Sequence, residues 1–329
     1  MSEPCSDHLF KCLELIIEDS GDSRTRFTAS RGPQLNPHTI YGGELMAQAL
    51  KSAICTVESD RKPISLHCYF HLSSDANKDN CYEVQKMRDG RSFTHRLVTC
   101  HSNSSNSGLA FQLDCSFKKA EKASNSFTPS MPKCPHHSEL QTLNNFINTC
   151  PDKEKIGSHI KMFTKYVNVL CPFEFKPVDS EQIAGLNITL KGHSQIWIRL
   201  LEAKHYTSEQ ANDMFNKYRE CFLAYMSDLF LLTTANITRE NLGMVASLNH
   251  TMWFYNPENK LTYRDWVLMD IQLQQMDSAI AVVTATMWLE NGTVLATMTQ
   301  QGLLRSKQLP RNDISYAENI SLNASDSTN

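Results

Sequence analysis

The feature that most constrains the fold is an internal repetition, in which an apolar helix followed by four strand-like segments occurs twice. In the first half the helix begins at Tyr41-Gly42-Gly43, and its apolar residues recur at helical spacing up to Ile54. Four segments with strand-like alternation follow, near residues 64–71, 82–87, 92–99 and 109–117. A helix this apolar is expected to be buried and wrapped by the sheet that follows it.

The second half repeats this order. Segments 172–178 and 195–201 are expected to be strands, apolar residues from Phe215 to Phe230 recur at spacings of three and four, and four more strands are expected at 244–254, 266–274, 279–289 and 294–304. The strand after each helix begins similarly, with Ser65-Leu66-His67 in one half and Ser247-Leu248-Asn249 in the other. Repetition at this scale indicates duplication. We therefore predict an α+β fold with two curled antiparallel sheets, each wrapping a buried helix.

The chain is expected to divide at a polar passage rich in Ser, Pro and Lys between the two repeats. We predict an N-terminal unit over residues 1–120, a connecting segment over 121–170 and a C-terminal unit over 171–307. Residues 308–329 are polar, and we expect this tail to be disordered.

Composition excludes several classes of protein. The formal net charge of −3 argues against a protein that coats nucleic acid. There is no apolar run of about 18 residues, so no membrane span is expected. The first residues do not form a secretory signal and the last do not form a peroxisomal Ser-Lys-Leu address, so we expect an intracellular protein, in the cytoplasm or the peroxisomal matrix. In a reducing compartment the 11 cysteines are expected to be mostly buried thiols.

Several familiar catalytic motifs are absent from the sequence. It has no Walker A motif, no Rossmann fingerprint and no G-x-S-x-G nucleophile elbow. Cys134-Pro-His136-His137 superficially suggests metal ligands, but no second Cys/His pair stands at the usual spacing. The sequence therefore predicts no metal and no organic cofactor.

A series of motifs, in order along residues 8–306, resembles the acyl-CoA thioesterase II family, and within it the peroxisomal branch. In the first half they are Ile40-Tyr-Gly-Gly-Glu-Leu-Met-Ala-Gln-Ala-Leu50, Leu66-His-Cys-Tyr-Phe70 and Arg88-Asp-Gly-Arg-Ser-Phe93. In the second half they are Tyr225-Met-Ser-Asp228, Asn249-His-Thr-Met-Trp-Phe254 and Gln300-Gln-Gly302 with Arg305. The resemblance implies a double hotdog fold, an acyl-CoA substrate, a homodimer and no cofactor. It also implies hydrolysis of a fatty acyl-CoA to free fatty acid and coenzyme A.

The resemblance also implies a catalytic group of an Asp, a Ser or Thr hydroxyl, and a Gln that together position and activate water. The corresponding residues here are Asn249, Gln274 and Gln300, with Leu273 beside the second position. Asparagine can orient a water molecule but cannot accept its proton, and the hydroxyl is missing at Leu273-Gln274. Only Gln300 keeps the family's residue type, and the sequence offers Asp228, Asp270, Asp277 and His250 as candidates for a substitute base, none of which it singles out. Strand alternation places His250 on the opposite face from Asn249.

Gly42, Gly43 and His67 are the candidate substrate-binding residues. The glycines open a helix, whose N-terminus attracts anionic groups of a ligand, although they are equally compatible with a tight helix entry. His67 lies in the H-x-Y-F strand, where a histidine is more often a satisfied strand residue than a ligand.

Two other functions are compatible with the same scaffold. The altered residues at 249 and 273–274 permit an acyl-CoA-binding or lipid-binding protein with little hydrolysis. A hydratase acting on enoyl-CoA is disfavoured, because no Asp/His motif lies on a shared loop.

Overall fold

The computed structural model describes residues 6–30, 40–72, 79–101, 108–121, 125–156, 171–186, 191–235, 242–256, 258 and 260–306. The first half contains α1 (Asp7–Cys12), β1 (Leu15–Ser20), β2 (Arg24–Ala29), α2 (Gly42–Ile54), β3 (Arg61–Phe70), β4 (Asn80–Asp89), β5 (Phe93–His101) and β6 (Leu109–Lys119). The connecting segment contains a 3₁₀ turn, η1 (His137–Glu139), and α3 (Leu143–Thr149). The second half contains β7 (Phe173–Pro177), α5 (Ser180–Ala184), β8 (His193–Leu200), α6 (Ser208–Lys217), α7 (Arg219–Ser227), α8 (Leu231–Ala235), β9 (Leu242–Phe254), β10 (Val267–Asp277), β11 (Ile280–Leu289) and β12 (Val294–Ser306).

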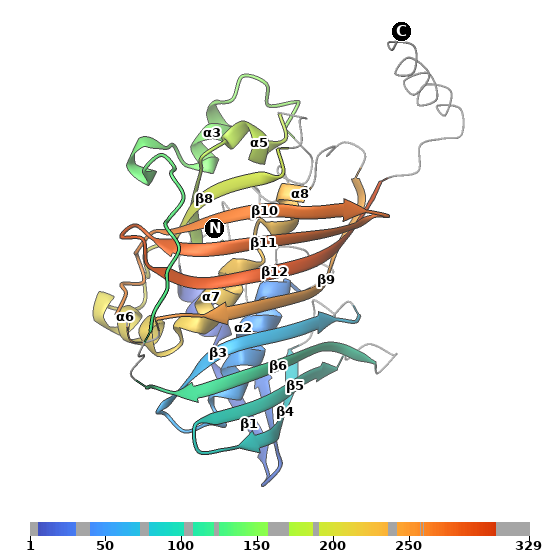
Figure 1. Cartoon of the computed structure of the whole chain (residues 1–329), viewed down its shortest axis with the longest axis vertical. Helices are drawn as coiled ribbons and strands as arrows, with labels where there is room; N and C mark the ends of the chain where they lie inside the picture. Colours follow the sequence, from blue (N-terminus) through green and yellow to red (C-terminus); the bar gives the residue numbers. More distant parts are fainter. Residues whose placement is uncertain are drawn as a thin grey trace.

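The strands form one continuous twelve-stranded sheet, in the order β1-β2-β4-β5-β6-β3-β9-β12-β11-β10-β8-β7 (Figure 1). The order of the first six strands is mirrored in the last six, so each half contributes the same arrangement. Each set of four strands that the sequence predicted after a helix is present, within a few residues of its expected limits. The duplication and the α+β double hotdog fold are therefore confirmed, with the two sheets joined edge to edge.

The two half-sheets meet where β3 pairs with β9 in antiparallel fashion. His67 lies opposite Thr251 and Tyr69 lies opposite Asn249, while Cys68 lies opposite His250 between these two pairs. The similarity between Ser65-Leu66-His67 and Ser247-Leu248-Asn249 indicates that His67 of the first repeat corresponds to Asn249 of the second. The pairs His67–Thr251 and Asn249–Tyr69 are therefore equivalent in the two repeats. A local pseudo-twofold axis therefore passes between Cys68 and His250.

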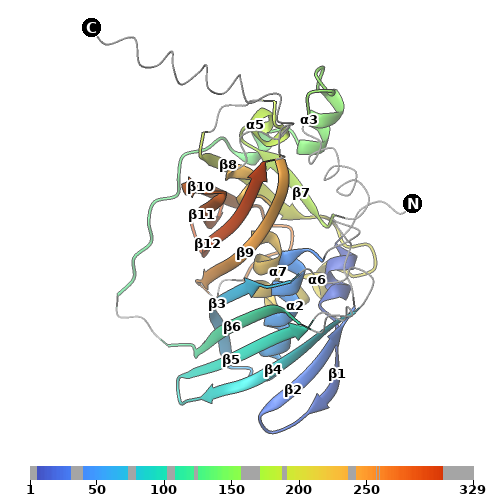
Figure 2. The same ribbon diagram turned by 90° about the vertical axis from the view of Figure 1, so that its right-hand side faces the viewer.

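Helices α2, α6, α7 and α8 lie on one face of the sheet, and the described part of the connecting segment that leads up to η1 runs along the other face (Figure 2). Helix α2 is buried at every position from Gly43 to Ala53, which explains its apolar composition. Its one amide side chain, Gln48, is fully paired: Nε2 donates to the carbonyls of Cys12 and Ser30, and Oε1 accepts from Asn80 and Tyr82. This glutamine thus ties the helix to the strands around it.

The second apolar helix differs from the prediction because it is broken into α6, α7 and α8. The first break falls at Tyr218, whose backbone (φ −125°, ψ 28°) leaves the helical region. Its ring receives the Lys51 ammonium of α2 at 3.4 Å from the ring centroid, a cation–π contact that fixes this corner against the other half. Helix α7 runs antiparallel to α2, because Lys51 lies at one end of the contact and Tyr41 reaches Tyr225 at the other.

Other expectations concern the ends of the chain and its cysteines. The polar tail, residues 308–329, lies outside the described residues, as does part of the connecting segment. Seven of the ten described cysteines are buried, as predicted, and all ten are free thiols. Within the described residues, no helix has both the length and the apolar character needed to cross a membrane.

The junction between the halves is expected to depend on Leu66, which is fully buried and lies opposite Met252. Leu66→Ala should lower the free energy of unfolding by about 2–5 kcal/mol, because it leaves a cavity that rigid strands cannot close. Urea denaturation measures this loss. His67→Gln, on the exposed face of the same strand, should change stability by less than about 0.5 kcal/mol, and an equal effect of both variants would contradict the assignment.

Candidate active site

A hydrogen-bonded cluster joins the two halves where the C-terminus of α7 meets the N-terminus of α2. Asp228, directly after α7, accepts a 2.6 Å hydrogen bond from Nε2 of Gln300 on β12. The same Nε2 donates to Oγ of Ser247 on β9 at 2.9 Å, and this hydroxyl lies 3.4 Å from the Asp228 carboxylate. The backbone N–H of Gly43 also donates to Asp228. Three elements of the second half and one of the first therefore converge on a single carboxylate.

Burial raises the pKa of Asp228 from its ordinary value of 3.8 to about 6. The hydrogen bonds from Gln300, Gly43 and Ser247 act in the opposite direction, because they favour the ionised form. As whole residues Asp228 and Ser247 are half-buried, whereas Gln300 beside them is buried. A carboxylate of this kind is mostly ionised at neutral pH and is a stronger base than an exposed aspartate.

The side-chain oxygen of Gln300 differs from its side-chain nitrogen in its hydrogen bonding. Gln300 is 1% exposed, and its Oε1 has no hydrogen-bond partner among the described residues. A buried acceptor without a partner is costly, and such atoms are commonly satisfied by a water molecule or a ligand. The cluster therefore offers an acceptor for a water proton beside a carboxylate that can also accept one.

The two glycines permit the close approach of the helices. A Cβ on Gly42 would lie 2.5 Å from Oδ2 of Asp228, and one on Gly43 would lie 2.4 Å from the carbonyl oxygen of Tyr225. Tyr41, the residue before α2, makes no side-chain cap, and its hydroxyl donates instead to the Tyr225 carbonyl at 2.8 Å. The carboxylate of Asp228 takes the position of a capping anion at the positive end of α2. The glycines are thus required by helix packing, and the N–H of Gly43 is already bonded to the protein.

The structure does not bring Asn249, Gln274 and Gln300 into one hydrogen-bonded group. Asn249 lies on the outer face of the sheet, where its Nδ2 donates to Oε1 of Gln301 at 3.0 Å. Gln274 is exposed on β10, and its Nε2 donates to Oγ1 of Thr284 at 2.7 Å. Gln300 points to the inner face, toward Asp228. Of the three, Gln300 alone belongs to the cluster described above.

The outer face also contains His67. Its side chain is exposed, with Nδ1 3.3 Å from Oγ1 of Thr251 and the ring edge-on to Trp253 at a centroid distance of 5.9 Å. His67 and Asn249 therefore share the outer face of the β3–β9 pair, whereas Gly42 and Gly43 lie at the inner cluster.

His250 lies on the inner face, opposite in direction to Asn249, as strand alternation predicted. It is fully buried, and its Nε2 lies 3.1 Å from Oγ of Ser227. Because Ser227 Oγ donates to the carbonyl of Ala224, it accepts from His250, whose Nε2 therefore carries the proton. Burial lowers the pKa of His250 to about 3, so the ring is neutral and only weakly basic. The other substitutes, Asp270 and Asp277, lie on β10 away from the cluster, where Asp270 binds His193 and Gln195.

Ser247 is the residue that sequence reasoning missed, and the reason is a β-bulge. Gln301 lies opposite Asn249, but the next residue, Gly302, lies opposite Ser247, so Leu248 is an extra residue in β9. Strict alternation would place Ser247 and Asn249 on one face. The bulge instead turns Ser247 inward with His250. Asp228 did carry a sequence signal through its Tyr225-Met-Ser-Asp228 motif, but its position after a helix obscured its proximity to Gln300.

Comparison with known proteins gives the family. Residues 31–117 match the acyl-CoA thioesterase N-terminal domain, and residues 149–304 match the acyl-CoA thioesterase C-terminal domain. The chain is 27% identical over 272 residues to acyl-coenzyme A thioesterase 8 of Homo sapiens, covering 82% of this chain and 81% of that protein. It is 26% identical over 284 residues to acyl-CoA thioesterase 2 of Haemophilus influenzae, covering 81% and 87% of the two chains.

A solved structure agrees over a longer span. The acyl-CoA thioesterase II TesB2 from Mycobacterium marinum superposes with a TM-score of 0.64 at 26% identity, covering 91% of this chain and 98% of that one. The N-terminal family match spans α2 to β6, and the C-terminal match spans β7 to β12, so each falls within one half of the sheet. With both domain models matched in order over more than half of its length, this chain belongs to the acyl-CoA thioesterase family.

Proposed function

We propose that this protein hydrolyses acyl-CoA thioesters to free fatty acid and coenzyme A, with Asp228 and Gln300 as the groups that activate water. The observation that carries the proposal is Oε1 of Gln300, which has no partner in the described part of the chain, on the side chain whose Nε2 is bonded to the Asp228 carboxylate. Gln300 is the one residue of the implied catalytic group that keeps its family type. Asp228 supplies the carboxylate that Asn249 lacks.

In this proposal a water molecule donates one hydrogen bond to Gln300 Oε1 and its other proton to Asp228. The oxygen of that water then attacks the thioester carbon to form a tetrahedral intermediate. Collapse of the intermediate breaks the C–S bond, and the coenzyme A thiolate takes the proton that Asp228 had accepted. The positive end of α2, next to Asp228, stabilises the negative charge of this intermediate. Ser247 acts as a positioning residue, because its hydroxyl accepts from Gln300 Nε2 and so orients the amide.

An acyl-CoA-binding protein with little catalysis is the second candidate. It is favoured by the outward position of Asn249 and Gln274, which leaves two of the three implied catalytic positions away from Gln300. The two functions differ in one measurement. A binding protein retains a non-hydrolysable acyl-CoA analogue but releases no coenzyme A from the thioester, whereas the proposed enzyme does both.

We also propose an intracellular location, supported by the ten free cysteines of the described residues. The homodimer and the peroxisomal location that the family resemblance implied stay predictions.

Asp228→Asn is expected to lower kcat by about 10²–10⁴, because the amide keeps the shape of the carboxylate but cannot accept the water proton. Release of coenzyme A from acyl-CoAs of several chain lengths measures the rate. Asp277→Asn, an exposed aspartate at the end of β10, is the matched control and should leave kcat unchanged. Equal rates for wild type and Asp228→Asn, with both proteins folded, would contradict the proposed base.

The pH dependence should report the same group. Since the base must be ionised, kcat/KM of the wild type should rise as pH increases through about 6 and then level off.

The free energy of unfolding should change in the opposite direction. The pKa of Asp228 in the folded protein is above its ordinary value of 3.8, so between these two values the folded protein binds more protons than the unfolded chain. The stabilising contribution of Asp228 is therefore fully present below pH 3.8. This contribution is lost as pH rises to about 6, so wild type should lose stability relative to Asp228→Asn across that window.

Asn249→Asp tests whether the base acts from the position that the family resemblance implies. Because Asn249 lies on the outer face with Gln301, a carboxylate there should change kcat by less than about threefold. The same coenzyme A release assay applies. A gain on the order of 10²–10⁴ would show instead that residue 249 reaches the water, and would overturn the assignment of Asp228.

A further inference from the structure

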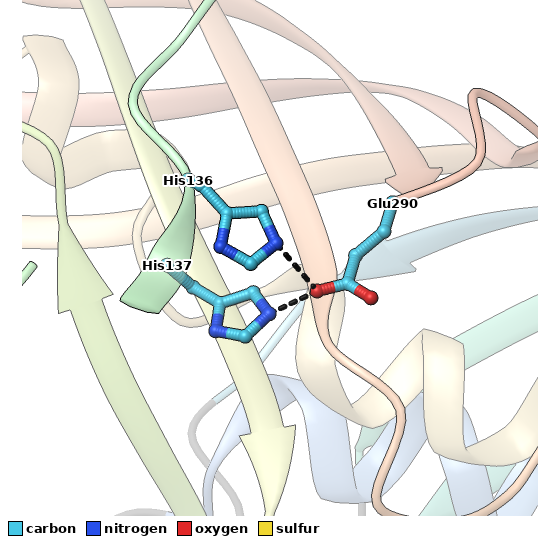
Figure 3. Close-up of side chains that lie close together, drawn as sticks. All are labelled: His136, His137 and Glu290. Carbon is cyan, nitrogen blue, oxygen red and sulfur yellow. Dashed lines mark hydrogen bonds and ion pairs between the residues drawn. The ribbon is translucent and has the colours of Figure 1, made fainter. Parts of the chain in front are cut away.

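A second group of titratable side chains lies on the sheet face that the helices leave uncovered. His136 and His137, at the start of η1 in the connecting segment, meet Glu290 in the turn between β11 and β12 (Figure 3). In the sequence, Glu290 lies 153 positions after His137 and 154 positions after His136. None of them takes part in the Asp228 cluster, so the catalytic proposal does not use them.

The three side chains converge on one point. Each side chain offers one ligand atom, a ring nitrogen or a carboxylate oxygen, and these three atoms all lie within 4.8 Å of one another. His136 Nε2 is 3.2 Å from Glu290 Oε1, and His137 Nε2 also contacts this oxygen. Neighbouring ligand atoms of a tetrahedral ion with bonds of about 2.0–2.1 Å lie roughly 3.3 Å apart. The His136–Glu290 separation already matches that spacing.

The histidines are held in place by the sheet beneath them. The His137 ring stacks on Trp266 at a centroid distance of 4.8 Å and an angle of 23°. The indole N–H of Trp197 donates to the carbonyl of Pro135 at 3.0 Å, which fixes the backbone before the pair. His136 Nδ1 accepts a hydrogen bond from the backbone N–H of Ser138 at 3.3 Å and lies 2.7 Å from its Oγ, so the ring is held at the start of η1.

We propose that His136, His137 and Glu290 form a binding site for Zn²⁺ or a similar divalent transition metal. Two imidazole nitrogens and one carboxylate oxygen are ligand types that such ions prefer, and three protein ligands leave a fourth position for water. The ion bridges the connecting segment and the β11–β12 turn, two parts of the chain that are far apart in the sequence. The bound ion stabilises the position of this segment on the outer face of the second half-sheet.

The sequence contained half of this site. Cys134-Pro-His136-His137 lacks a second Cys/His pair, and the third ligand is a glutamate from a distant hairpin that no spacing rule identifies. Cys134 does not belong to the convergent atoms. Two cations lie nearby: Lys176 donates to the carbonyl of His137 at 2.9 Å, and the Arg199 guanidinium lies 4.4 Å from the Trp266 ring centroid. Their charge opposes the ion, so affinity should be below that of a four-ligand structural zinc site.

The test uses the full chain freed of metal by a chelator and then titrated with Zn²⁺ by calorimetry. We expect one Zn²⁺ per chain, together with an increase in Tm. Glu290→Gln and His137→Gln should each weaken binding by more than about 100-fold, since each removes a direct ligand. His193→Gln is the matched control, because His193 is a comparably exposed histidine 2.8 Å from a single carboxylate, Asp270, and should bind Zn²⁺ like the wild type.

Co²⁺ provides a second measurement that separates this site from the cysteines. Coordination by nitrogen and oxygen gives no thiolate-to-metal charge-transfer band, whereas binding by cysteines does. The proposal is overturned if the wild type binds no Zn²⁺, if the charge-transfer band appears at one equivalent, or if Glu290→Gln binds as tightly as the wild type. Near-ultraviolet circular dichroism confirms that each surface variant is folded. These readouts do not involve acyl-CoA, so they stand apart from the thioesterase proposal.

Discussion

The pairing of β3 with β9 is the interaction on which the rest of the structure depends. It joins two six-stranded halves into a single sheet and places Cys68 and His250 opposite each other on a pseudo-twofold axis. Helices α2 and α7, one from each half, pack side by side on the same face of this sheet. A chain that carries the same fold twice can therefore build one shared site from residues of both copies.

The meeting of the helices explains the glycine pair better than a ligand contact does. With no Cβ at Gly42 or Gly43, the end of α7 approaches closely enough for Asp228 to accept from a backbone N–H of α2. This places a carboxylate in a position where burial raises its pKa to about 6, against the opposing effect of the hydrogen bond from Gly43. One packing contact thus links the geometry of the fold to the acid–base property that the proposed chemistry needs.

The same sheet has a different role on its two faces. The inner face of β9 and β12 carries Ser247 and Gln300 toward the helices, while the outer face carries Asn249 and Gln301. Farther along the outer face, a tryptophan cluster holds the connecting segment and orients His136 and His137 toward the β11–β12 turn. The protein therefore places the candidate site for chemistry and the candidate site for a metal on opposite faces of the sheet.

The sequence by itself determined the repeated helix and strands, because periods of 3.6 and 2 are local properties that a buried face imposes on the residues. It also identified Gln300 and the Gly42-Gly43 helix entry through the family motifs. Only the tertiary structure decided that Ser247 faces inward and Asn249 outward, because one bulged residue reverses the alternation on which a strand prediction relies. It alone brought Asp228 to Gln300 and Glu290 to the histidine pair, since such contacts depend on strand order and register rather than on spacing along the chain.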